Sequence, residues 1–218
     1  MAKKKNILEQ DLLSYYMDYV LAHHKKPASV YHFAKTNGFE EAEFYNFFGS
    51  FEALEKNIFK VFFENTLRAL EASESYDTFD ARNKLLSFYF TFFENLTANR
   101  SYVVYALNPD KNNLKGILVL SELKKSFNKY ISNLDIETLD IKEERIERFQ
   151  VKALQESAWI QLMMTLKFWL DDTSAGFEKT DIFIEKSLNT SFDLINMAPL
   201  KSVIDFGKFL FKEKMHMN

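Results

Sequence analysis

Large apolar side chains recur every three or four residues along almost the whole chain, and few helix breakers interrupt them. Phenylalanine occurs 23 times, against 5 glycines and 3 prolines in 218 residues. One face of a helix buries residues at this spacing, whereas a half-buried strand buries every second residue. The sequence therefore predicts an all-α fold, built from long helices packed against one another.

The composition also narrows the class of protein. The chain has no cysteine, so disulfides and thiolate chemistry play no part. No apolar run reaches the roughly 18 residues that can span a bilayer. Glu9 and Asp11 interrupt any signal-peptide core, and the net charge of −3 gives no overall attraction to nucleic acid or anionic lipid. We expect a cytoplasmic location.

The first forty residues predict one long helix followed by a short one. The long helix is expected over 6–24, with Leu8 on its buried face, and it ends before Pro27, because a proline pushes the preceding residue out of the helical region. Ser29 is a good N-cap for the short helix, and Gly38 supplies a left-handed stop.

A third, short helix and a fourth, long helix follow. We expect Phe44, Phe47 and Phe48 of the third helix to point inward, Gly49 to end it, and Ser50 to cap the fourth. Two short helices between longer ones, separated by a glycine turn, predict a helix-turn-helix.

The remainder of the chain also has helical spacing. The predicted segments are a buried stripe over 85–96, helices over 100–107, 114–134 and 143–170, a turn over 171–176, a helix marked by residues 184–195, and a short amphipathic helix after Pro199.

The stretch from Ser29 to Leu54 resembles the DNA-binding signature of TetR-family regulators. The matching residues are Ser29, Phe33, Ala34, Gly38, Tyr45, Phe48, Ser50, Glu52 and Leu54. The resemblance covers about a quarter of the chain and keeps the family's spacing without a gap. It implies a helix-turn-helix, DNA-binding-like domain over 1–50 and a helical effector-binding and dimerisation domain over 51–218.

The resemblance also implies a function, that of a ligand-responsive repressor that binds DNA as a homodimer. The dimer would form through the last long helices, around Trp159 to Trp169 and Thr180 to Ile195. The residues expected to contact DNA are Ser29, Lys35, Tyr45 and Asn46, together with Lys3, Lys4 and Lys5.

The third helix departs from the family in its charge. Family members open this helix with Ser-Lys-Gly-Thr, whereas this chain has Glu40, Glu41, Ala42 and Glu43. Residues 39–55 contain five acidic residues and no basic one, and residues 1–60 contain eight lysines and eight acidic residues. Because phosphate neutralisation supplies most non-specific DNA affinity, these carboxylates would repel the DNA backbone.

A second hypothesis follows from that charge. The chain could be a TetR-fold protein that has lost DNA binding and binds a hydrophobic or lipid-like ligand. The segment from Thr165 to Leu188 is similar to part of a lipid-binding family of ubiquinone biosynthesis, which shares the fold and meets the membrane through a C-terminal amphipathic helix. The resemblance implies a membrane-surface contact by the helix after Pro199.

A hydrophobic small-molecule effector is expected in the C-terminal part under either hypothesis. Aromatic side chains cluster there without a convergent set of charges, which is typical of an apolar cavity, although core packing explains the same pattern. The candidate pocket residues are Phe88, Tyr89, Phe92, Tyr102, Tyr105, Trp159 and Met163.

The sequence predicts no enzyme, metal or cofactor. His23 and His24 are adjacent and face different sides of a helix, while His32 and His216 have no partner at ligand spacing. The glycines are too few for a phosphate-binding loop, and no nucleophile lies beside a base. Turn chemistry accounts for Asp172 better than acid–base catalysis.

Overall fold

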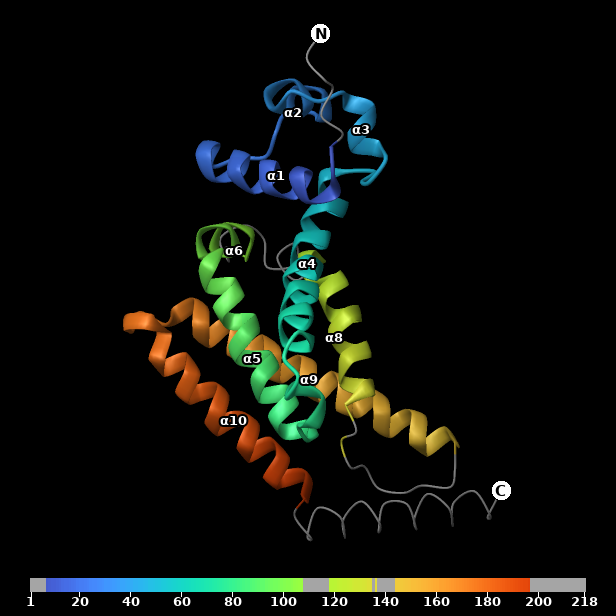
Figure 1. The fold of residues 1–218 in the computed structure, drawn as a ribbon, viewed down its shortest axis with the longest axis vertical. Helices are drawn as coiled ribbons and strands as arrows, with labels where there is room; N and C mark the ends of the chain where they lie inside the picture. Colours follow the sequence, from blue (N-terminus) through green and yellow to red (C-terminus); the bar gives the residue numbers. More distant parts are fainter. Residues whose placement is uncertain (1–6, 108–117, 135, 137–143, 197–218) are drawn as a thin grey trace, which may run out of the picture. The chain divides into compact units, whose positions relative to one another are not determined.

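The computed structural model describes residues 7–107, 118–134, 136 and 144–196, and every regular element among them is helical (Figure 1). The α-helices are α1 (Glu9–His23), α2 (Val30–Asn37), α3 (Glu41–Tyr45), α4 (Phe51–Glu71), α5 (Ala81–Ala98), α6 (Arg100–Leu107), α8 (Ser121–Asn133), α9 (Glu144–Asp171) and α10 (Glu178–Asn196), and two 3-10 turns span Tyr76–Thr78 and Ala175–Phe177. The all-α prediction is confirmed for the part of the chain described.

The chain forms two compact units. The first unit comprises Met1–Ala69 and Thr91–Lys129, and the second comprises Leu70–Phe90 and Tyr130–Asn218. None of the described helices is both long and apolar enough to cross a membrane.

An aromatic cluster holds together the head, which we define as α1, α2, α3 and the first turns of α4, all within the first unit (Figure 1). Phe33 of α2 is fully buried at its centre. The rings of Tyr16, Phe39, Phe44 and Phe51 lie edge-on to it, with centroids 5.5–6.3 Å away. Aromatic pairs prefer this edge-to-face geometry, so one side chain ties four segments of the head together.

The expected caps Ser29 and Ser50 and the expected stop at Gly38 are confirmed, whereas Gly49 does not end the third helix, which already ends at Tyr45. The Ser29 Oγ accepts a hydrogen bond from the backbone N–H of His32 at 3.1 Å, and Gly38 ends α2 with a φ of 74°. The Ser50 Oγ accepts the N–H of Ala53 at 3.3 Å in the first turn of α4. These local bonds fix the two ends of the helix-turn-helix.

Two expectations about buried residues in the head are wrong. Leu8 is 61% exposed, because it is the N-cap of α1 and lies outside the helix that was expected to begin at residue 6. Phe47 is 41% exposed, whereas Phe44 and Phe48 are buried. The third helix ends at Tyr45, so Phe47 follows the path of a turn and not the inward face of a helix.

In the second unit, α9 and α10 contact each other and are joined by a tight turn around Asp172. The Asp172 Oδ1 accepts the N–H and hydroxyl of Ser174 at 2.8 and 2.7 Å. Its Oδ2 accepts the N–H and hydroxyl of Thr180 at 3.0 and 2.7 Å. The turn predicted over 171–176 is therefore confirmed, and it is organised by one buried carboxylate.

The apolar stripe expected on α5 is also confirmed. Its members are all buried, namely Leu85, Phe88, Tyr89, Phe92 and Leu96. The helix expected over 100–107 has those bounds in the structure. The short helix predicted after Pro199, with its expected membrane contact, lies outside the described residues.

Candidate functional site

A groove of about 450 Å³ lies between α2 and α3 on the head. It is lined by Tyr31, Ala34, Lys35, Phe39, Glu40, Glu41, Ala42 and Tyr45. Lys35 and Tyr45, two of the residues expected to contact DNA, are therefore brought to one surface, where both are exposed.

The other expected DNA contacts lie elsewhere or outside the described residues. Ser29 is exposed, but its hydroxyl oxygen already caps α2. Asn46 is exposed and follows α3 as its C-cap. Lys3, Lys4 and Lys5 lie in the N-terminal segment that is not described.

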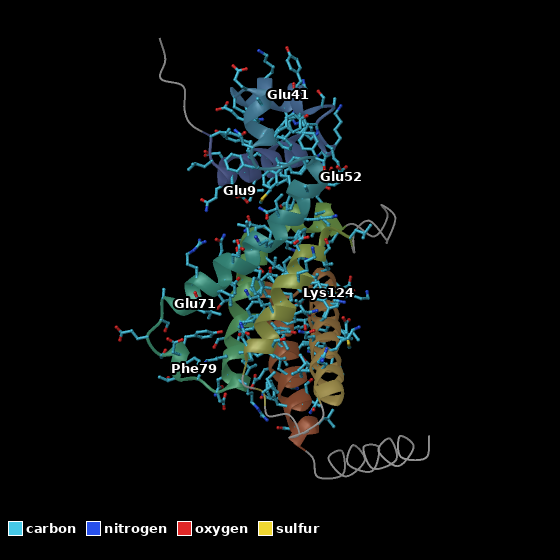
Figure 2. All side chains as sticks on the ribbon, turned by 90° about the vertical axis from the view of Figure 1, so that its right-hand side faces the viewer. Glu9, Glu41, Glu52, Glu71, Phe79 and Lys124 are labelled. Carbon is cyan, nitrogen blue, oxygen red and sulfur yellow. The ribbon has the colours of Figure 1, made fainter. Side chains whose placement is uncertain are left out.

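Glu40 and Glu41 line the groove, and the acidic residues at the start of the third helix also shape the helix itself. The Glu43 carboxylate accepts the backbone N–H of Glu40 at 2.8 Å and so closes the first turn of α3. The Tyr45 hydroxyl donates to Glu41, whose side chain is labelled on the head in Figure 2, at 3.3 Å. Carboxylates are favoured at a helix N-terminus, which gives these residues a structural role in addition to any binding role.

The phenol of Tyr45 responds to the same environment. Desolvation and the adjacent charge of Glu41 raise the pKa of Tyr45 above its ordinary value. The hydroxyl is protonated at neutral pH, as an ordinary tyrosine is, and acts as a hydrogen-bond donor.

A buried polar network in the first unit was not expected from the sequence. Tyr16 of α1 is fully buried, and its hydroxyl donates to the Glu55 carboxylate at 2.5 Å. Lys26 Nζ pairs with the other oxygen of Glu55 at 2.7 Å. Burial first, and then the charge of Glu55, raise the pKa of Tyr16, and the same two causes raise the pKa values of Tyr102 and Tyr105. No short motif signals this network, because Tyr16 and Glu55 are far apart in the chain.

The seven expected pocket residues divide between the units. Phe92, Tyr102 and Tyr105 belong to the first unit, and Phe88, Tyr89, Trp159 and Met163 belong to the second. All are buried except Tyr105 and Met163, which are partly exposed. None of the seven lines the groove between α2 and α3 or the groove between α9 and α10 that is described next. Their burial fits core packing as well as a ligand cavity.

A second groove, of about 580 Å³, lies between α9 and α10. It is lined by Gln161, Phe168, Lys179, Ile182, Phe183, Lys186, Ser187, Thr190 and Ser191. The rings of Phe168 and Phe183 stack there with centroids 4.6 Å apart. The two α9 tryptophans that marked the predicted dimer helix are buried.

Three exposed apolar residues of α9 lie close to these tryptophans in the sequence. Ile160 is 57% exposed and Met164 is 55% exposed, and Phe168 continues the same row. These three residues are spaced by four, so they share one face of the helix. That spacing is visible in the sequence, but the predicted dimer helix was placed by its two larger tryptophans and not by this row.

Among the described residues, no three His, Cys, Asp or Glu side chains come together in a way that could hold a metal ion. His23 instead stacks on Tyr19, with ring centroids 4.2 Å apart, and its Nδ1 donates to the Tyr19 carbonyl at 2.9 Å.

A family model described as tetracyclin repressor-like, C-terminal domain, matches residues 84–210, which is more than half of the chain. No curated protein matches the chain. The matched residues include all of α6, α8, α9 and α10 and most of α5, so the match covers the helical part that follows the head. The chain therefore belongs to the family of tetracycline-repressor-like regulators.

Proposed function

We propose that the chain is a ligand-responsive transcriptional regulator that acts as a non-catalytic, cytoplasmic homodimer and binds DNA through the head. In this proposal residues 1–50 form the DNA-binding-like domain, and residues 51–218 form the effector-binding and dimerisation domain. The observation that carries it is the convergence of Lys35 and Tyr45 on one exposed groove of an intact helix-turn-helix. A lysine and a tyrosine hydroxyl are both suited to phosphate oxygens.

The charge of the same groove sets the expected strength of DNA binding. Glu40 and Glu41 line it beside Lys35, so an approaching phosphate backbone meets more negative than positive charge. We expect the affinity for generic duplex DNA to be weak, since non-specific affinity comes mainly from phosphate neutralisation.

A charge reversal at Glu41 tests this function. If the head docks on DNA through α3, Glu41→Lys should tighten generic duplex binding. It should also steepen the salt dependence of binding by the amount expected for about one to two additional phosphate contacts. Fluorescence anisotropy over a series of salt concentrations measures both effects. Tight, sequence-specific binding by the unmodified chain at physiological salt would refute the charge argument, with carboxylates then accepting from cytosine amino groups.

The acidic groove also supports a second candidate function. If neither the unmodified chain nor Glu41→Lys binds DNA, the better description is a TetR-fold protein that has lost DNA binding and carries a hydrophobic or lipid-like ligand. Native mass spectrometry of the purified protein is the direct test of that ligand. A co-purifying apolar molecule, reduced in occupancy when Phe88 or Trp159 of the second unit is replaced by alanine, would support the predicted pocket.

The homodimer is proposed to form through the row of Ile160, Met164 and Phe168 on α9 together with Ile182 on α10. These side chains are apolar and exposed in the single chain, and contiguous exposed apolar patches mark interfaces. Two such helices from each copy would build a four-helix interface.

Sedimentation at micromolar concentration tests the dimer. We expect Met164→Asp to convert a dimer into a monomer, because a carboxylate would be buried without a partner. Val151→Asp is the matched control, since Val151 is also an exposed apolar residue of α9 but lies about two and a half turns before Ile160, on the opposite face. A monomeric unmodified chain would contradict the proposal.

A further inference from the structure

The groove between α2 and α3 combines two kinds of surface that attract cations. Its lining includes the rings of Tyr31, Phe39 and Tyr45 and the carboxylates of Glu40 and Glu41. Tyr31 is 58% exposed and Tyr45 is 53% exposed, so both rings are open to a partner. Aromatic faces attract ammonium and guanidinium groups, and carboxylates pair with them through charge-assisted hydrogen bonds.

One cation already occupies part of this surface. Lys35 Nζ lies 5.8 Å from the centroid of the Tyr31 ring. Lys35 is the one basic residue among the eight that line the groove. Tyr31 and Lys35 are four residues apart on α2, so this local contact places an ammonium group against the Tyr31 ring within the chain itself.

The charge around the groove is complementary to a basic partner. Glu43 and Glu52 add two further carboxylates to the head, and residues 39–55 contain no basic residue. A polyanion would meet like charge along this stretch, whereas an arginine-rich or lysine-rich segment would meet opposite charge.

The size and composition of the groove fit a protein segment. A volume of about 450 Å³ accommodates one or two long side chains. Tyrosine is enriched at protein interfaces, because its ring supplies contact area and its hydroxyl supplies a hydrogen bond.

We propose that the α2–α3 groove binds an arginine-rich or lysine-rich segment of a partner protein, and that this partner occludes the face of the head that would meet DNA. A guanidinium group enters the groove, pairs with Glu41 and lies against the ring of Tyr31 or Tyr45. The occlusion rests on the proposed function, but the binding does not. The partner would thus control access to the head by competition, separately from any effector in the helical domain.

Fluorescence anisotropy of the full chain with a labelled peptide of alternating arginine and glycine tests this site at physiological salt. The matched probe replaces each arginine by citrulline, which keeps the shape and removes the charge. We expect the arginine peptide to bind and the citrulline peptide to bind at least about tenfold more weakly. Equal binding of the two peptides, or no binding of either, overturns the proposal.

Substitutions locate the peptide on the chain. Glu41→Gln and Tyr31→Ala should each weaken the arginine peptide about five- to tenfold, and Lys35→Ala should tighten it, because the intramolecular cation no longer competes. Glu94→Gln is the control, since it removes an exposed carboxylate of the same unit on α5. A loss of affinity as large in Glu94→Gln as in Glu41→Gln overturns the site. Glu40→Gln gives a second reading if thermal melting shows that Glu41→Gln fails to fold.

The sign of the Glu41→Gln effect separates a basic partner from DNA. Removing this carboxylate should weaken the arginine peptide but strengthen generic duplex DNA, because the two ligands carry opposite charge. If Glu41→Gln weakens both ligands alike, the charge complementarity is not the cause and the proposal fails. Complete absence of DNA binding would refute the proposed function alone, and the peptide results would still decide the partner site.

Discussion

The family relationship is recognised differently in the head and in the α9–α10 pair. The head keeps the spacing of the TetR signature over residues 29–54 but lies outside the match at 84–210. The α9–α10 pair lies within that match, although its residues carry no short signature of regulators. A short helix-turn-helix depends on a few caps and turns, so its residues can be named individually. A helical bundle depends on many buried residues, whose pattern is distributed along the chain.

Their exposed surfaces differ as well. The groove of the head is lined by tyrosines, carboxylates and one lysine, whereas the face of α9 presents Ile160, Met164 and Phe168. The first surface suits a charged partner and the second an apolar one. The head therefore combines the helix-turn-helix framework with an acidic groove, while the α9–α10 pair presents an exposed apolar row.

The largest expected effect tests whether the framework of the head depends on one ring. Phe33→Ala should lower the free energy of unfolding by about 3–5 kcal/mol, because a buried phenylalanine leaves a cavity among four aromatic neighbours. Urea denaturation followed by circular dichroism measures this. The exposed neighbour Tyr31→Ala is the control and should change stability by less than about 0.5 kcal/mol. Equal losses in the two variants would contradict the central role of Phe33.

The next effect concerns the buried network that the signature does not contain. Tyr16→Phe should cost about 1.5–3 kcal/mol, because its hydroxyl donates to the ionised carboxylate of Glu55. The same denaturation experiment applies, with the partly exposed Tyr15→Phe as the control. If Tyr16→Phe leaves the free energy of unfolding unchanged, Lys26 alone satisfies the Glu55 carboxylate.

A smaller, pH-dependent effect is expected in the turn between α9 and α10. Burial opposes ionisation of Asp172, but hydrogen bonds from Ser174 and Thr180 lower its pKa from 3.8 to about 2. A lowered folded-state pKa stabilises the protein above 3.8, and this contribution is lost as the pH falls towards 2. Thermal melting of the unmodified chain should decline over that window more steeply than melting of Asp172→Asn.

Asp171→Asn is the matched control for this window. Asp171 is exposed and pairs with Lys167 at 3.0 Å, so its neutralisation should leave the pH profile close to that of the unmodified chain. An identical profile for Asp172→Asn and the unmodified chain would show that this carboxylate does not stabilise the turn by its charge.

The smallest effect returns to the head and its most local feature. Ser29→Ala should cost about 1 kcal/mol, because the N–H of His32 loses its cap. Ser14→Ala, an exposed substitution within α1, should be nearly neutral in the same denaturation experiment. If the two variants are equally stable, the second helix is held by packing of Phe33 and not by its cap.

The sequence by itself determined the helices, the caps and stop at Ser29, Gly38 and Ser50, and the family resemblance of the head. Ser29, Gly38 and Ser50 act through bonds and dihedral angles within a few residues, which is why their roles were readable without a structure. The α5 stripe was equally readable, because all its members share one helical face and all of that face is buried.

The tertiary structure alone decided which apolar residues face solvent and which charges meet. Periodicity marks a face of a helix, but burial of that face depends on segments distant in the chain. Leu8 and Phe47 are exposed because α1 begins and α3 ends at positions that only the packed head fixes. On α9, packing buries both tryptophans and leaves Ile160 and Met164 outside. The Tyr16–Glu55 pair and the groove that joins Lys35, Glu41 and Tyr45 likewise arise only when separate helices come together.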